Sequence, residues 1–144
     1  MAARLAARPT TATANITVLL IGGNDQKDTP EKRAATRKNL QAIISSLKDT
    51  GSKVLVLQYH VLVNPKSPET AWVHLDDNND LIAEVANEQD VPVLNMAPIM
   101  QQALQQYTVT QLVSGIDGVH LNPGGEIVFS QAIYGKLVEL GWVK

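Results

Sequence analysis

Short apolar runs alternate with segments of helical periodicity from residue 16 onwards, and this alternation constrains the fold more than any other feature. The apolar runs cover residues 16–21, 53–57 and 91–95. Strands that are separated by helical segments are typical of a parallel sheet, because a crossover of a dozen or more residues is needed to return the chain for the next parallel strand. The sequence therefore predicts an α/β fold built on a parallel sheet.

The helical segments carry their own start and stop signals. Leu40, Ile43, Ile44 and Leu47 fall at the i, i+3, i+4, i+7 spacing of one buried helix face. The ends of this helix are predicted by three residues with strong positional preferences: Thr29 as the N-cap, Pro30 in the first helical position and Gly51 as the stop. Asn122 is expected to cap the last helix. The later helices are expected around three apolar groups: Leu81, Ile82, Val85 and Ala86; Ile99, Met100, Ala103 and Leu104; Phe129, Ala132, Ile133, Leu137 and Leu140.

The composition predicts an N-terminal arm at residues 1–15 and one domain at residues 16–144, since 144 residues leave little room for a second domain. The arm is rich in Ala, Thr and Arg. Mitochondrial transit peptides and flexible arms share this composition, whereas a secretory signal is disfavoured because Arg4 and Arg8 interrupt the stretch where its apolar region would lie. We expect the arm to pack on its own domain or on a partner.

Composition and charge exclude several classes of protein. The chain has no cysteine, which excludes a disulfide framework and cysteine-ligated zinc or iron-sulfur sites. Its net charge of -2 predicts no nucleic-acid binding, because phosphate recognition needs a concentrated basic face. The apolar runs are also too short for a membrane span, which needs about 20 residues. We expect no membrane-spanning segment.

Two polar constellations fall where an open α/β sheet binds its ligands, which is beyond the carboxyl ends of its strands. The first is the sequence Gly22, Gly23, Asn24 and Asp25, directly after the first apolar run. Glycines allow a sharp turn here, and an Asn amide can point into the crevice as a hydrogen-bond donor. These residue types are equally good turn formers, so a purely structural role stays open.

The second constellation is Asp117 and His120, three residues apart in a glycine-containing turn. A carboxylate beside an imidazole fixes the ring's tautomer and stabilises the cation that forms when the ring accepts a proton, which is what a general base requires. The structural alternative is that Asp117 or Asn122 only caps the following helix.

The remaining candidates are weaker. His60 follows the second apolar run, and His74 lies close to Asp76, Asp77 and Asp80, but the spacing matches no recognised metal-ligand pattern. We therefore expect both histidines to be solvated loop residues, and we expect no metal and no cofactor.

The order and the residue sequences of the two constellations resemble those of one known family. Residues 16–142 are similar to the later two-thirds of an SGNH (GDSL-type) hydrolase, in the branch of small arylesterases, thioesterases and lysophospholipases. In that family a Gly-x-Asn-Asp block supplies an oxyanion-hole Asn, matched here by Gly22, Asn24 and Asp25, and an Asp-x-x-His block supplies the triad acid and base, matched by Asp117 and His120. The resemblance implies a three-layer, flavodoxin-like parallel-sheet fold that is truncated at its N-terminal strands.

The departure from the family pattern concerns the nucleophile. The family's Gly-Asp-Ser block does not occur in the 144 residues, and Ser114, the serine nearest in sequence to the Asp117–His120 turn, lies in no strand-to-helix elbow that would project its hydroxyl. Two hypotheses follow. Either the serine of an ester-cleaving site comes from another polypeptide or from a removed portion, or the fold serves as a non-catalytic structural or accessory subunit, for example of a virion.

Both hypotheses predict a protein partner. In the family, the strand that corresponds to Ile16 to Ile21 pairs with the strand that bears the nucleophile. Without that neighbour an apolar strand edge is left open, and such an edge pairs readily with another chain. We expect a second copy or a nucleophile-bearing fragment to pair there.

Overall fold

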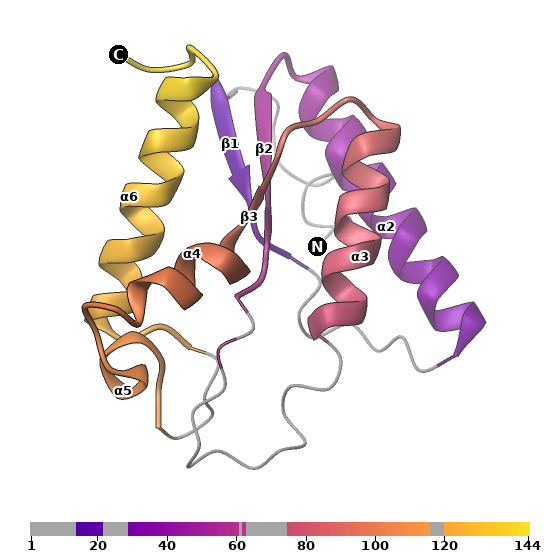
Figure 1. Cartoon of the computed structure of the whole chain (residues 1–144). Helices are drawn as coiled ribbons and strands as arrows, with labels where there is room; N and C mark the ends of the chain where they lie inside the picture. Colours follow the sequence, from indigo (N-terminus) through magenta and orange to yellow (C-terminus); the bar gives the residue numbers. More distant parts are fainter. Residues whose placement is uncertain (1–13, 22–28, 61, 63–74, 116–119) are drawn as a thin grey trace. The chain divides into compact units, whose positions relative to one another are not determined.

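The computed structural model describes residues 14–21, 29–60, 62, 75–115 and 120–144 (Figure 1). Three strands, β1 (Ile16–Leu19), β2 (Lys53–Gln58) and β3 (Val93–Asn95), form one parallel sheet in the order β1-β2-β3. The α/β fold with a parallel sheet is therefore as predicted. The chain divides into two compact units, residues 1–58 with 77–93 and residues 59–76 with 94–144.

The parallel register of β1 and β2 organises the first unit. Ile16 pairs with Lys53 at one end and Leu19 pairs with Val56 at the other. On its opposite side β2 reaches the chain that leads into β3, where the Val56 N–H donates to the Pro92 carbonyl at 3.0 Å. Within the described residues β1 pairs with β2 alone, so β2 is the inner strand and β1 lies at an edge.

The edge strand β1 is less covered than β2. Four consecutive residues of β2, from Val54 to Leu57, are buried, so side chains on both faces of this strand are packed. In and just after β1 only Leu19 is buried, whereas Val18 is 38% exposed and Leu20 is 39% exposed. Both side chains lie on the same face of this segment, and the described residues cover that face only in part.

Two helices belong to the first unit, α2 (Pro30–Asp49) and α3 (Leu75–Glu88). The Thr29 hydroxyl accepts a hydrogen bond from the Lys32 N–H at 3.3 Å, and Gly51 has a φ of 79°, so both predicted boundaries of α2 are confirmed. Three residues of the predicted buried stripe, Leu40, Ile43 and Ile44, are buried, and the fourth, Leu47, is half-buried.

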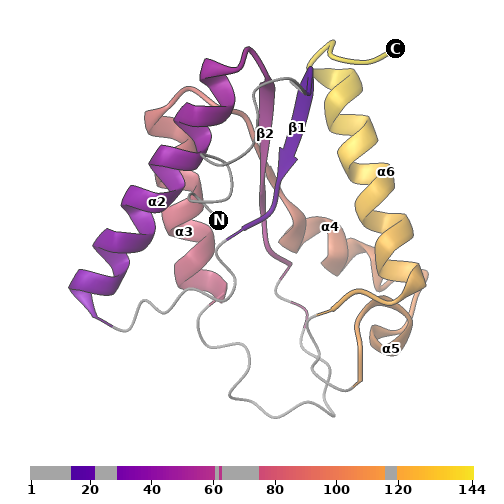
Figure 2. The same ribbon diagram turned by 180° about the vertical axis from the view of Figure 1, so that it is seen from behind.

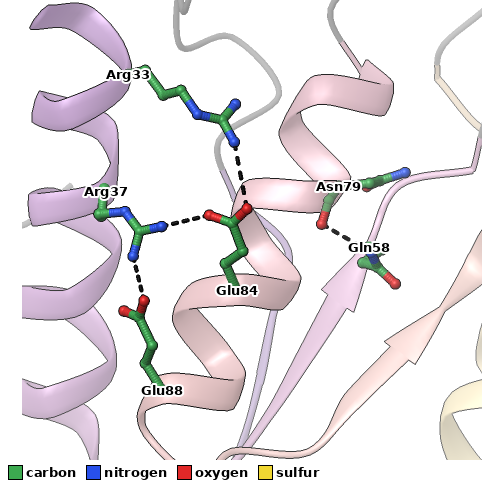
Figure 3. A network of polar contacts seen from close by, with 6 residues as sticks. All are labelled: Arg33, Arg37, Gln58, Asn79, Glu84 and Glu88. Carbon is green, nitrogen blue, oxygen red and sulfur yellow. Dashed lines mark hydrogen bonds and ion pairs between the residues drawn. The ribbon is translucent and has the colours of Figure 1, made fainter. Parts of the chain in front are cut away.

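Helices α2 and α3 lie side by side and are joined by a polar seam (Figures 2 and 3). Arg37 of α2 bridges two carboxylates of α3: it donates to Glu88 at 2.6 Å and also to Glu84. The Arg37 hydrogen bond and charge hold the pKa of Glu88 below its ordinary value, and the same contacts raise the pKa of Arg37. The pairs are partly exposed, so this seam orients the two helices more than it stabilises them.

The second unit contains α4 (Met96–Ala103), α5 (Val109–Leu112) and α6 (Pro123–Glu139). The short helix α5 falls in a stretch for which the sequence predicts no element. It forms because the Gln111 side chain folds back to accept from the Thr108 N–H at 2.8 Å. No helix in the described parts of the chain is long and apolar enough to cross a membrane.

The core of the second unit is small. Its fully buried side chains come from α4 and from the end of α5: Met96, Met100, Leu112 and Val113. Phe129 of α6 is buried as predicted, whereas Ala132, Ile133, Leu137 and Leu140, which the pattern also turns inward, are only half-buried. On the opposite side of α6, Ile127, Tyr134 and Val138 are exposed.

The Arg37 seam generates a prediction about stability and pH. Arg37→Gln should lower the midpoint of thermal unfolding slightly, and Lys38→Gln, which changes an exposed neighbour on the same helix, should not. Because the folded-state pKa of Glu88 is depressed, the contribution of the pair is complete above the unfolded value of about 4.3 and is lost as the pH falls through the folded value. Thermal unfolding of the three proteins at pH 7 and pH 3 checks this, and a difference between wild type and Arg37→Gln that persists at pH 3 would contradict it.

Candidate functional site

His120 lies in an exposed turn directly before α6, and its backbone is held by the segment that follows α5. Its carbonyl accepts from the Ser114 N–H at 2.8 Å, and the next residue, Leu121, forms an antiparallel bridge with Val113. Backbone pairing therefore joins residues 113–114 to residues 120–121. Asp117, the predicted partner of His120, lies outside the described residues.

Asn122 connects these paired segments to α5 and α6. Its side-chain amide donates to the Thr110 carbonyl at 2.7 Å and to the Val113 carbonyl at 3.0 Å, and its backbone N–H donates to the Leu112 carbonyl at 2.9 Å. It occupies the N-cap position of α6, as predicted, but its side chain makes no capping hydrogen bond. The predicted capping role is thus wrong in its chemistry, because the amide is used on the carbonyls at the end of α5.

Two glycines let α6 begin directly against α5. A Cβ on Gly124 would lie 2.7 Å from the Gln111 carbonyl oxygen, and one on Gly125 would lie 2.2 Å from the Leu112 carbonyl oxygen. Both contacts are with backbone, which cannot swing away as a side chain does. The sequence signal was present, since two consecutive glycines in the first turn of a helix are intrinsically unfavourable and indicate a packing reason.

The predicted oxyanion residues follow β1. Gly22, Gly23, Asn24 and Asp25 lie outside the described residues, so their role stays a prediction. Because β1 and β2 are parallel, their carboxyl ends lie at the same end of the sheet.

His60 follows β2 and corrects one expectation. Its side chain is 3% exposed and packs edge-on against Phe129, with ring centroids 5.8 Å apart and an angle of 87°. The prediction of a solvated loop residue was wrong, because the ring fills space in the core of the second unit. His74 lies outside the described residues. Within the described ranges no three His, Asp or Glu residues gather to hold a metal ion.

Comparison with known proteins gives one sequence match and several structural ones. The sequence model of the GDSL-like lipase/acylhydrolase family matches residues 1–126. The chain belongs to this family. No curated protein sequence matches significantly.

The solved structures similar to this GDSL-like chain are esterases and hydrolases. LAE5, an α/β hydrolase from the metagenome of Lake Arreo in Spain, has a TM-score of 0.72 at 21% identity over 99% of this chain and 67% of its own. Axe2, an acetylxylan esterase from Geobacillus stearothermophilus, has a TM-score of 0.72 at 18% identity over the same shares. At these identities the likeness shows the fold, and the chain spans about two thirds of either protein.

The close approach of α5 and α6 generates a prediction with a matched control on one helix. Gly125→Ala should destabilise the protein by about 1 to 3 kcal/mol, because its methyl group would meet the Leu112 carbonyl. Gly135→Ala should stabilise it by about 0.5 to 1 kcal/mol, because its methyl group would point into open space and Ala favours the helix. Urea unfolding of both variants tests this, and equal effects would show that α5 and α6 are not packed as described.

Proposed function

We propose that this GDSL-like chain supplies the acid–base and oxyanion parts of a carboxylic ester hydrolase. One observation carries the proposal: the backbone of His120 is joined by a hydrogen bond to the segment that follows α5 and lies directly before α6. The order Asp117, Gly118, Val119 and His120 resembles the family's Asp-x-x-His block. An imidazole with a fixed backbone and an exposed ring suits proton transfer to and from a bound substrate.

Each predicted residue has a role in this chemistry. The Asp117 carboxylate accepts from one ring nitrogen of His120, and the other ring nitrogen accepts the proton of an attacking hydroxyl. The Asn24 amide and the backbone N–H groups near Gly22 and Gly23 donate to the oxyanion that forms on the ester carbonyl. Asp25 completes the turn that orients Asn24.

The nucleophilic serine is proposed to come from outside these 144 residues, since they contain no Gly-Asp-Ser sequence. His120 without a serine could activate only water. Serine hydrolases that lose a triad member keep roughly 10³ to 10⁴ over the uncatalysed rate, far below a working esterase. A fragment that carries a Gly-Asp-Ser turn is therefore the partner that would restore turnover.

The open edge of β1 is the proposed docking place for this partner. A strand edge offers unpaired N–H and C=O groups, which another strand satisfies. Val18 and Leu20 are partly exposed on one face of this segment, beside that edge, and the segment from Ile16 to Ile21 contains no charge or proline to discourage pairing. The same features favour the second candidate function, a non-catalytic subunit that uses this edge for assembly or for pairing with its own copy.

Complementation tests the catalytic proposal. The chain alone should show negligible hydrolysis of p-nitrophenyl acetate and no labelling by a fluorophosphonate, and adding a Gly-Asp-Ser-bearing fragment should restore both. The restored activity should fall by about 10³-fold or more in His120→Ala. Labelling of the lone chain, with Ser114→Ala abolishing it, would show that the chain carries its own nucleophile.

Charge substitutions test the docking edge. Val18→Lys with Leu20→Lys should abolish association with the fragment or with a second copy, because two ammonium groups would oppose strand pairing. Ile127→Lys, at a position that is 47% exposed on α6, is the matched control and should leave association unchanged. Native mass spectrometry gives the readout, and the opposite pattern would move the docking surface to α6.

A further inference from the structure

We propose that Asn122 is a positioning residue for His120. Its hydrogen bonds to carbonyl groups at the end of α5 hold the paired backbone segments from which the His120 turn extends. The catalytic meaning of this inference rests on the proposed role of His120 as the general base. The positioning itself can be measured without any catalysis.

The hydrogen bonds of Asn122 are directed to acceptors that α5 leaves open. A helix of four residues satisfies few of its own carbonyls, and those of its last turn need partners from elsewhere. The side-chain amide of Asn122 bonds the Thr110 and Val113 carbonyls at 2.7 and 3.0 Å, and its backbone N–H bonds the Leu112 carbonyl at 2.9 Å. One residue thus ends α5 while it begins α6.

These bonds reach His120 through a short path. Val113, whose carbonyl the Asn122 amide holds, pairs with Leu121 in the antiparallel bridge. The next pair outward is Ser114 and His120, joined by the hydrogen bond of 2.8 Å. Loss of the Asn122 amide would free the Val113 carbonyl and loosen the bridge one step below His120.

The competing explanation is that Asn122 only caps α6. Its φ of -89° and ψ of 170° suit an N-cap, and Asn is favoured at that position. An N-cap, however, uses its side-chain oxygen as an acceptor, whereas Asn122 uses its side-chain nitrogen as a donor. The two explanations therefore differ in which atom of the amide matters.

Asn122→Asp separates them. Asp is at least as good an N-cap as Asn and suits the positive end of a helix, so a capping role predicts no loss. Positioning predicts a loss, because a carboxylate has no N–H to donate and would face two carbonyl oxygens. Asn95→Asp is the matched control, since Asn95 caps α4 through its oxygen, which accepts from the Ala97 N–H at 2.9 Å.

Amide hydrogen exchange of Ser114 in the full chain is the first readout. We expect exchange about tenfold faster in Asn122→Asp and no change in Asn95→Asp. Asn122→Ser, neutral and competent as a cap, should also exchange faster. Amides in the middle of α6 and of β2 report whether the two units of each variant are folded, and if Asn122→Asp does not fold, Asn122→Ser decides. If the Ser114 amide of the folded Asn122 variants exchanges at the wild-type rate, the inference is overturned.

The second readout is the His120 ring, followed by nitrogen chemical shifts across a pH titration. Asn122→Ser should shift the titration midpoint or the tautomer ratio without adding a charge, and in the complemented esterase it should lower kcat more than it raises KM. If Ser114 exchanges faster while the nitrogen chemical shifts of the His120 ring and their pH dependence stay unchanged, Asn122 is a purely structural residue and the positioning role is overturned. If the wild-type chain with its fragment cleaves no ester, the proposed function fails, while Ser114 exchange and the ring titration still test the positioning.

Discussion

The parallel hydrogen-bonded register between β1 and β2 is the constraint on which the rest of this structure depends. Leu19 opposite Val56 sends the chain out of both strands at one edge of the sheet. Burial of four consecutive residues, Val54 to Leu57, holds β2 in place through close packing on both of its faces.

A second constraint acts where α5 meets α6. The hydrogen bonds of Asn122 and the missing side chain of Gly125 let two backbones approach closely, and the turn that carries His120 grows from that junction. A catalytic imidazole needs a position reproducible to fractions of an ångström, which secondary structure supplies better than a free loop does. In this chain His120 thus lies beside a short scaffold of backbone hydrogen bonds.

The sequence predicted what depends on local periodicity and missed what depends on tertiary contact. The three strands and the ends of α2 followed from apolar runs, from Thr29 and from Gly51, whose preferences are intrinsic. Helix α5 was missed because Val-Thr-Gln-Leu is a poor helix sequence that is held by its own Thr108–Gln111 contact. The burial of His60 depends on Phe129, which is far away in sequence. The partners of the Asn122 amide were beyond reach for the same reason, although Gly124 and Gly125 marked a close approach.

We propose above that Asn24 and His120 serve one ester-cleaving site whose serine comes from outside these 144 residues. A paramagnetic label tests it directly, and the cysteine-free chain allows a single label through Asn24→Cys. We expect strong broadening of the His120 ring resonances and little effect on Gly141, which follows the far end of α6, a helix about 25 Å long. Broadening of Gly141 with a sharp His120 would place the two groups at opposite ends of the protein and contradict the account.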